Sequence, residues 1–109
     1  MSLHKVKKVV IITEKIISDQ ICKLVDDSSA SGYTIASVGG KGSRNVRTES
    51  DGASVVGGFS NVKIEAIVKD NSVATPLVEA INERFFKNYS GIAFIEDVEI
   101  LRLHKFVVE

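Results

Sequence analysis

The apolar residues of the chain repeat with two different periods, and the order of these periods limits the possible folds. Residues 6–13 (VKKVVIIT) form a β-branched run that is typical of a buried central strand. From residue 14 to about residue 30, apolar positions recur at helical spacing. Residues 33–38 alternate between two faces, which predicts a second strand. The first part of the chain is therefore expected to fold as strand, helix, strand.

The same sequence of periods returns in the second half of the chain. Residues 61–69 alternate cleanly, which predicts a strand with one buried face. A second helix follows, with either Ser72 or Thr75 as its N-cap. Residues 92–95 predict a fourth strand, and residues 98–103 a further short one.

The predicted order is strand, helix, strand, long loop, strand, helix, strand, which is the split βαβ arrangement. It predicts one α+β domain over residues 1–109 with a ferredoxin-like βαββαβ fold. Residues 39–60 would be a long loop between the second and third strands. Both helices would cover one face of the sheet and leave the other open. In a chain with 44% apolar residues, such a face is often covered by oligomerisation.

The composition argues against several classes of function. Fourteen basic residues are balanced by 14 acidic ones, whereas an electrostatic nucleic-acid binder usually shows a basic excess. His4 and His104 have no partner at metal-ligand spacing, and Cys22 is the one cysteine. No apolar run approaches the roughly 20 residues of a transmembrane helix. We therefore expect a cytoplasmic protein with no metal site, no obligatory cofactor, no nucleic-acid partner and no direct membrane insertion.

The segment 39–60 (GGKGSRNVRTESDGASVVGGFS) is the most informative part of the chain. It holds six glycines and almost no large apolar residue, and loops of this length are usually functional or disordered. Glycines allow close backbone approach, successive N–H groups can cradle an anion, and lysine and arginine suit phosphate. The candidate phosphate-binding residues are Gly40, Lys41, Gly42, Ser43, Arg44 and Arg47. The alternative is a flexible, solvated hairpin loop, and the spacing of a Walker P-loop is absent.

Two positions outside this segment are further candidates. Thr13 lies where the first strand meets the first helix, so its hydroxyl either caps the helix or lines a cleft at the strand's end. Gly91 either closes the second helix or lets the backbone approach a ligand phosphate. Both interpretations stay open at each position.

Five short motifs, which keep their order and nearly their spacing, resemble those of a known family. They are Thr13-Glu14-Lys15, Gly32-Tyr33-Thr34, residues 39–47 (GGKGSRNVR), Asn61-Val62-Lys63 and Tyr89-Ser90-Gly91-Ile92. The chain resembles the SbtB family, a branch of the PII-like signalling proteins of cyanobacteria, over about residues 5–101. The run at residues 39–47 is the specific part of this resemblance, and the other motifs support it.

The resemblance implies a homotrimer whose inter-subunit clefts bind AMP, ADP, ATP or cyclic AMP as effector ligands. It implies that Lys41, Arg44 and Arg47 hold phosphate and ribose, that Gly91 belongs to a short loop meeting the phosphate, and that Thr13 lies near the cleft. Residues 39–60 correspond to the T-loop, which would contact an SbtA-like bicarbonate transporter. Such a partner would bring the protein to the inner face of the membrane. The short tail 102–109 lacks the cysteine that some family members use for redox control.

Three functional hypotheses follow. The first is a sensor without catalytic activity, in which ligand phosphate orders the base of the T-loop and thereby changes the affinity for a partner. The second is a slow nucleotide hydrolase in the same cleft, for which no general base or metal-ligand cluster is evident. The third is a ligand-independent trimeric docking module. We expect the first, and therefore no enzymatic activity.

Overall fold

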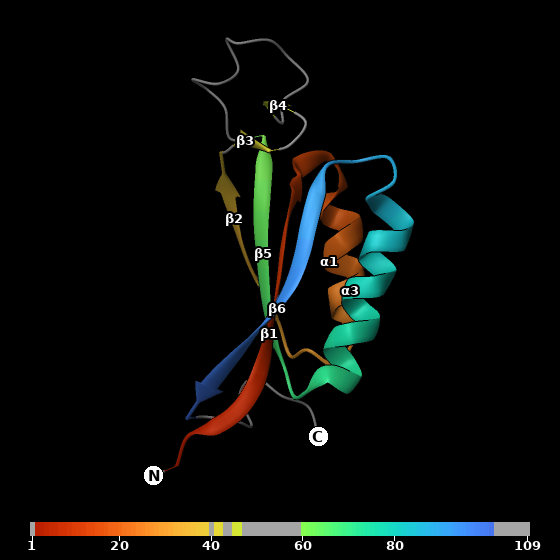
Figure 1. Cartoon of the computed structure of the whole chain (residues 1–109). Helices are drawn as coiled ribbons and strands as arrows, with labels where there is room; N and C mark the ends of the chain where they lie inside the picture. The colour runs from red at the N-terminus through yellow and green to blue at the C-terminus, as the bar shows by residue number, and fades with distance from the viewer. Residues whose placement is uncertain (1, 40, 43–44, 47–59, 102–109) are drawn as a thin grey trace.

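Four long strands form one antiparallel sheet, and two helices cover one of its faces (Figure 1). A computed structural model of the chain describes residues 2–39, 41–42, 45–46 and 60–101. The strands of the sheet are β1 (His4–Glu14), β2 (Thr34–Val38), β5 (Asn61–Val68) and β6 (Gly91–Ile100), in the spatial order β2-β5-β1-β6. The helical segments are η1 (Lys15–Ile17), α1 (Ser18–Asp27) and α3 (Asn71–Phe85), and the short strands β3 (Lys41–Gly42) and β4 (Asn45–Val46) pair with each other. The predicted ferredoxin-like α+β fold is confirmed, while most of the predicted long loop lies outside the described residues.

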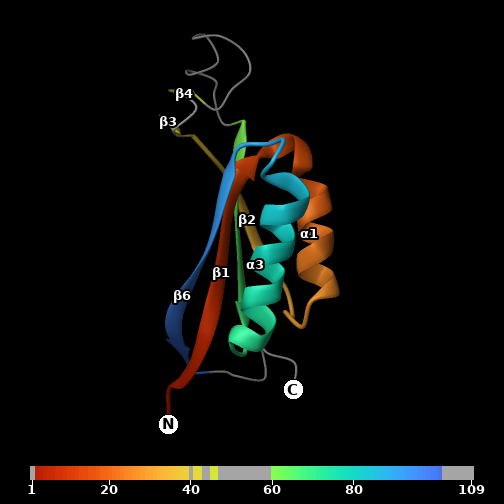
Figure 2. The same cartoon turned by 45° about the vertical axis from the view of Figure 1, so that its right-hand side comes forward.

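The hydrophobic core lies between the sheet and the two helices, which Figure 2 shows side by side over the same face. Because side chains alternate along a strand, Val9 and Ile11 of β1 point to the helices together with their β5 partners Ala66 and Ile64. The helices contribute the buried residues Ile21, Cys22 and Val25 from α1 and Ala74, Leu77, Ile81 and Phe85 from α3. Complete burial of one large apolar side chain stabilises a fold by roughly 1.5–3 kcal/mol. This single layer is therefore the main source of stability.

The first helix begins later than predicted. Strand β1 continues to Glu14, and a 3₁₀ turn precedes α1. Thr13 is therefore not a helix N-cap. It pairs on one side with Val62 of β5 and on the other with Gly91 of β6, and this double pairing keeps its backbone in the strand.

The second helix begins earlier than predicted. Its N-cap is Asp70, whose carboxylate accepts a hydrogen bond from the backbone N–H of Ser72 at 2.9 Å. This contact satisfies one of the free N–H groups of the first turn. The pKa of Asp70 lies below its usual value, first because the hydroxyl of Ser72 also donates to the carboxylate and second because of the bond from the Ser72 N–H. Thr75 and Pro76 lie inside the helix. The prediction of a cap at Ser72 or Thr75 was wrong because the preceding aspartate takes that role.

The last strand is continuous, where the sequence predicted two short ones. The acidic residues Glu96 and Asp97 interrupt the apolar pattern of β6 but stay in the strand. Each lies opposite a lysine of β1 in the register, Lys8 and Lys7 respectively, and forms an ion pair with it. Pairing with β1 therefore carries the strand through its charged residues.

The other face of the sheet has no helix on it. Lys8 lies there between Glu65 and Glu96, with its Nζ 3.4 Å from a carboxylate oxygen of each. The hydrogen bond to Glu96 is the main reason that the pKa of Lys8 is raised. Farther along the same face, Ile12 pairs with Ile92, whose side chain is 52% exposed. The open face thus combines charges that already have partners with exposed apolar surface.

Candidate functional site

One end of the sheet brings together segments that are distant in the sequence. Strands β1 and β2 end there, and β5 and β6 begin there. In the register, Glu14 and Val38 both pair with Asn61, while Thr13 pairs with Gly91. Both ends of the segment 39–60 are attached to this edge, because it leaves from β2 and returns to β5. The glycine-rich segment therefore starts and ends beside Thr13 and Gly91. This proximity is needed if all of them contribute to one site.

Thr13 fixes the turn that precedes β6. Its side chain is fully buried, at 0% exposure, and its Oγ1 donates a hydrogen bond to the backbone carbonyl of Ser90 at 2.7 Å. A buried hydroxyl needs such a partner, and the bond holds the turn against the end of β1. Thr13 lies at the end of the strand, and the alternative that its hydroxyl lines a cleft there stays a prediction. Its role here is to position the turn.

Gly91 is required by close packing. A Cβ at this position would lie 2.8 Å from Thr13 Oγ1 and 2.5 Å from Cζ of Phe86, with Cε1 of the same ring closer still. Helix α3 has already ended at Phe85, so Gly91 does not close it. The interpretation as a helix cap is wrong, and the absence of a side chain instead lets β6 start directly against Thr13.

The turn before β6 presents a backbone N–H to an anion. The N–H of Ser90 donates to Oε2 of Glu14 at 2.6 Å, and the carboxylate makes this a charge-assisted hydrogen bond. The backbone N–H of Lys15 in turn donates to the carbonyl of Ser60 at 2.8 Å, which ties the start of η1 to the start of β5. The anion at this turn is the protein's own carboxylate. This arrangement shows that the turn can hold a negatively charged group.

Asn61 adds a second polar group at this end of the sheet. Its side chain is buried, at 2% exposure, and its Oδ1 accepts no hydrogen bond from the residues that the structure describes. Most buried polar atoms in proteins are hydrogen-bonded, so this carbonyl oxygen needs an explanation. Sequence reasoning identified neither Glu14 nor Ser90 nor Asn61 as a site residue. The only available signal was their presence in the motifs that carry the family resemblance.

The structure brings together two of the eight predicted site residues, Thr13 and Gly91. The backbone of Lys41 and Gly42 forms β3, which pairs with β4 and lies just beyond the end of β2 (Figure 1). The remaining four predictions, Gly40, Ser43, Arg44 and Arg47, lie outside the described residues.

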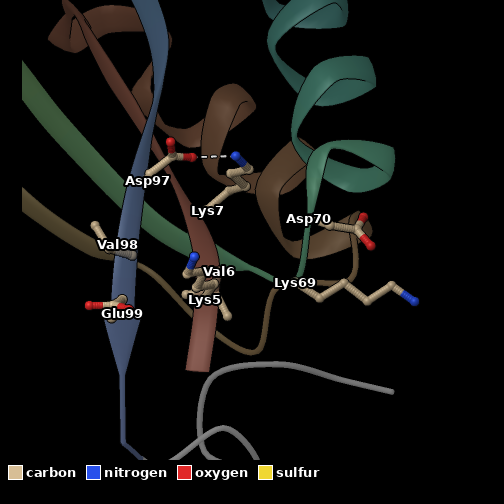
Figure 3. A pocket seen from close by; sticks show the side chains of 8 residues that line it. All are labelled: Lys5, Val6, Lys7, Lys69, Asp70, Asp97, Val98 and Glu99. Carbon is tan, nitrogen blue, oxygen red and sulfur yellow. Dashed lines mark hydrogen bonds and ion pairs between the residues drawn. The ribbon is translucent and has the colours of Figure 1, made fainter. Parts of the chain in front are cut away.

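A pocket of about 480 Å³ lies at the opposite end of the sheet (Figure 3). Its lining is Lys5, Val6, Lys7, Lys69, Asp70, Asp97, Val98 and Glu99. Lys7 and Asp97 point toward one another and form an ion pair, which lowers the pKa of Asp97. Three lysines are thus matched by three carboxylates, and this balance does not favour a polyanion. Lys5 and Thr13 are eight residues apart on β1, about 26 Å along an extended strand, so the pocket is separate from the Thr13 end.

The described residues show neither a metal centre nor a membrane span. Within residues 2–39, 41–42, 45–46 and 60–101, no three His, Cys, Asp or Glu residues are grouped in a way that could hold a metal ion. No helix in the same part of the chain is long and apolar enough to cross a membrane.

Comparison with known proteins agrees with the fold and covers nearly the whole chain. A putative PII-like signaling protein from Thermus thermophilus is 30% identical, with a TM-score of 0.76 and coverage of 98% of this chain and 100% of that one. CPII from Thiomonas intermedia bound to ADP, AMP and acetate is 30% identical, with a TM-score of 0.79 and coverage of 99% and 100%. CPII bound to ADP, AMP and bicarbonate is 29% identical, with a TM-score of 0.81 and coverage of 98% of both chains. The family model of nitrogen regulatory protein P-II matches residues 6–105, and this protein therefore belongs to the P-II family.

Proposed function

We propose that this PII-like signalling protein binds an adenine nucleotide at the Thr13 end of its sheet and transmits the occupancy to a partner through residues 39–60. The observation that carries the proposal is the turn before β6, whose Ser90 N–H already holds a carboxylate. The turn lies at the same edge as the start of the Gly/Lys/Arg segment. The bound ADP and AMP of the Thiomonas CPII relatives support an adenine nucleotide as the ligand.

In this proposal the charged side chains and the turn before β6 have different roles in binding the ligand. Lys41, Arg44 and Arg47 supply the cationic donors for phosphate and ribose. The Ser90–Gly91 turn contributes backbone N–H groups, and Thr13 keeps the turn in place through its bond to the Ser90 carbonyl. The ligand would be a reversible effector, and the protein would bind it without catalysing a reaction.

We further propose that the protein is a cytoplasmic homotrimer with nucleotide clefts between subunits. The open sheet face supports this, because its central charges Lys8, Glu65 and Glu96 are already paired while Ile92 is exposed. Covering such a face buries apolar surface without leaving an unpaired charge. The proposed partner is an SbtA-like bicarbonate transporter at the inner face of the membrane. The bicarbonate bound to the CPII relative is consistent with a link to inorganic carbon.

Isothermal titration of the purified protein with ATP, ADP, AMP and cyclic AMP tests the proposal. We expect micromolar binding of at least one of them, which corresponds to about −8 kcal/mol. Replacing Arg47 by alanine should weaken that binding by about 1.5–3 kcal/mol, the scale of a charged hydrogen bond. Arg84→Ala, which removes an exposed arginine of α3, is the matched control and should leave the affinity unchanged.

Two results would contradict a nucleotide sensor without catalytic activity. Absence of binding for all four nucleotides would exclude the sensor and favour a docking module that recognises protein alone. Release of ADP or AMP from ATP in the presence of magnesium would show a hydrolase. Light scattering tests the assembly, since a monomeric mass would exclude the trimer.

A further inference from the structure

Asn61 places an unused hydrogen-bond acceptor at the proposed nucleotide site. It is the first residue of β5, its side chain is 2% exposed, and its Oδ1 has no donor within residues 2–39, 41–42, 45–46 and 60–101. A buried acceptor without a partner destabilises the folded state, because it has lost water and gained nothing in return. The missing donor is therefore expected to arrive with a molecule that the folded chain binds.

The surroundings of Asn61 indicate which kind of ligand group could donate a hydrogen bond to its Oδ1. Its partners in the register are Glu14 of β1 and Val38 of β2, so the three side chains lie on one face at this end of the sheet. Glu14 adds a carboxylate to that face, and this carboxylate already accepts from Ser90 N–H. A phosphate oxygen beside the Asn61 carbonyl would meet another acceptor and the charge of Glu14. A neutral N–H or O–H group would instead supply the missing donor.

We propose that Asn61 Oδ1 accepts a hydrogen bond from the base amine or a sugar hydroxyl of the bound nucleotide, and that Asn61 is a specificity-determining residue. This inference rests on the proposed function, because it assumes that the nucleotide binds at this end of the sheet. An acceptor that is satisfied only by the correct ligand discriminates strongly, since an analogue without the donor leaves the acceptor unpaired. Asn61 thereby contributes to nucleotide selection separately from the cationic residues that hold phosphate.

The test compares the wild type with Asn61→Leu, which removes the acceptor at nearly constant size. Both proteins are titrated with ADP, with IDP, which lacks the base amine, and with 2′-deoxy-ADP, which lacks one sugar hydroxyl. We expect the wild type to bind ADP about tenfold more tightly than one of the two analogues. Asn61→Leu should bind ADP about tenfold more weakly than the wild type and should lose that discrimination. Asn82→Leu makes the same chemical change at an exposed position of α3 and should behave as the wild type.

Thermal unfolding without ligand separates recognition from a structural role. An acceptor that waits for a ligand predicts that Asn61→Leu unfolds at the same or a higher temperature than the wild type. An amide that stabilises the empty protein predicts a lower temperature, and that result would overturn the inference. So would a parallel loss of inorganic pyrophosphate binding, because it would place Asn61 on the phosphate.

The titrations distinguish the role proposed for Asn61 from the proposed binding of a nucleotide. If the wild type and Asn61→Leu bind ADP equally well, or if the discrimination persists in the variant, the role of Asn61 is refuted while the nucleotide site stands. If the wild type binds no nucleotide, the proposed function fails and this inference fails with it.

Discussion

Replacing Gly91 by alanine tests how tightly the turn before β6 is packed against the end of β1. The added Cβ would lie 2.8 Å from Thr13 Oγ1 and 2.5 Å from Cζ of Phe86, where ordinary contacts are 3.4–4 Å. The Phe86 ring is only half-buried and can move toward solvent. Thr13 is fully buried and β-branched, so it cannot move aside. The clash with Thr13 is therefore the one that the fold cannot relieve.

The expected loss of stability follows from three contributions. Overpacking a core typically costs about 1–3 kcal/mol. Displacing Thr13 weakens its hydrogen bond to the Ser90 carbonyl, which adds about 1 kcal/mol. The lower entropy of alanine in the unfolded chain offsets about 0.4–1 kcal/mol of this. We expect Gly91→Ala to lower the free energy of unfolding by about 2 kcal/mol.

Urea unfolding at a fixed protein concentration measures the effect, since the stability of an oligomer depends on concentration. Gly32→Ala is the matched control, because a Cβ at Gly32 would have no atom within 4 Å, and it should change stability by less than about 0.5 kcal/mol. Comparing the double variant Gly91→Ala/Phe86→Ala with Phe86→Ala alone removes the ring from the clash, so the cost of Gly91→Ala that persists in this background is due to Thr13. If Gly91→Ala were as stable as Gly32→Ala, the close approach at this turn would be refuted.

Three further predictions concern the same end of the sheet and the start of α3. Thr13→Val should destabilise the protein by about 1–3 kcal/mol in thermal unfolding because it leaves the Ser90 carbonyl without its donor, whereas Thr13→Ser should retain most of the stability. Glu14→Gln should tighten ADP binding in calorimetry, since it removes a negative charge that occupies the Ser90 N–H; unchanged or weaker binding would show that phosphate does not approach this turn. The pKa of Asp70 is lowered by its bond from Ser72, so its cap contributes stability above the usual value of 3.8, and this contribution is lost as the pH falls through the lowered pKa. Melting temperatures from about pH 5 to about pH 2 should therefore fall less steeply in Asp70→Asn, which keeps an uncharged acceptor at the cap.

The order of strands and helices could be predicted from local periodicity, because burial of one face imposes a period of two on strands and 3.6 on helices. The ends of these elements were less predictable. Thr13 has the residue type of an N-cap, yet it pairs with Gly91 of β6 and stays in the strand. Glu96 and Asp97 have the residue types of a loop, yet lysines on β1 keep them in β6. In each case a residue distant in the sequence overrides the local preference.

The candidate site, too, could be predicted from the sequence only in part. Its glycines and cationic residues could be predicted from composition, because phosphate binding needs flexible backbone and positive charge. Asn61 and the hydrogen bond from Ser90 to Glu14 could not, since an asparagine at the start of a strand and a glutamate at its end are ordinary surface residues by sequence. Only their position in the fold makes them unusual.

The sequence by itself determined the element order, the apolar stripes of the two helices and the location of the glycine-rich segment, because each depends on neighbouring residues. The tertiary structure decided which residues meet. Thr13 and the Ser90 carbonyl are 77 residues apart in the chain and 2.7 Å apart in space. That contact, the close packing at Gly91 and the unpaired acceptor of Asn61 all arise from the antiparallel register of β1 with β5 and β6. The alternation of apolar residues fixes which face of each strand is buried, whereas the residues that lie opposite one another depend on pairing between strands that are distant in the sequence.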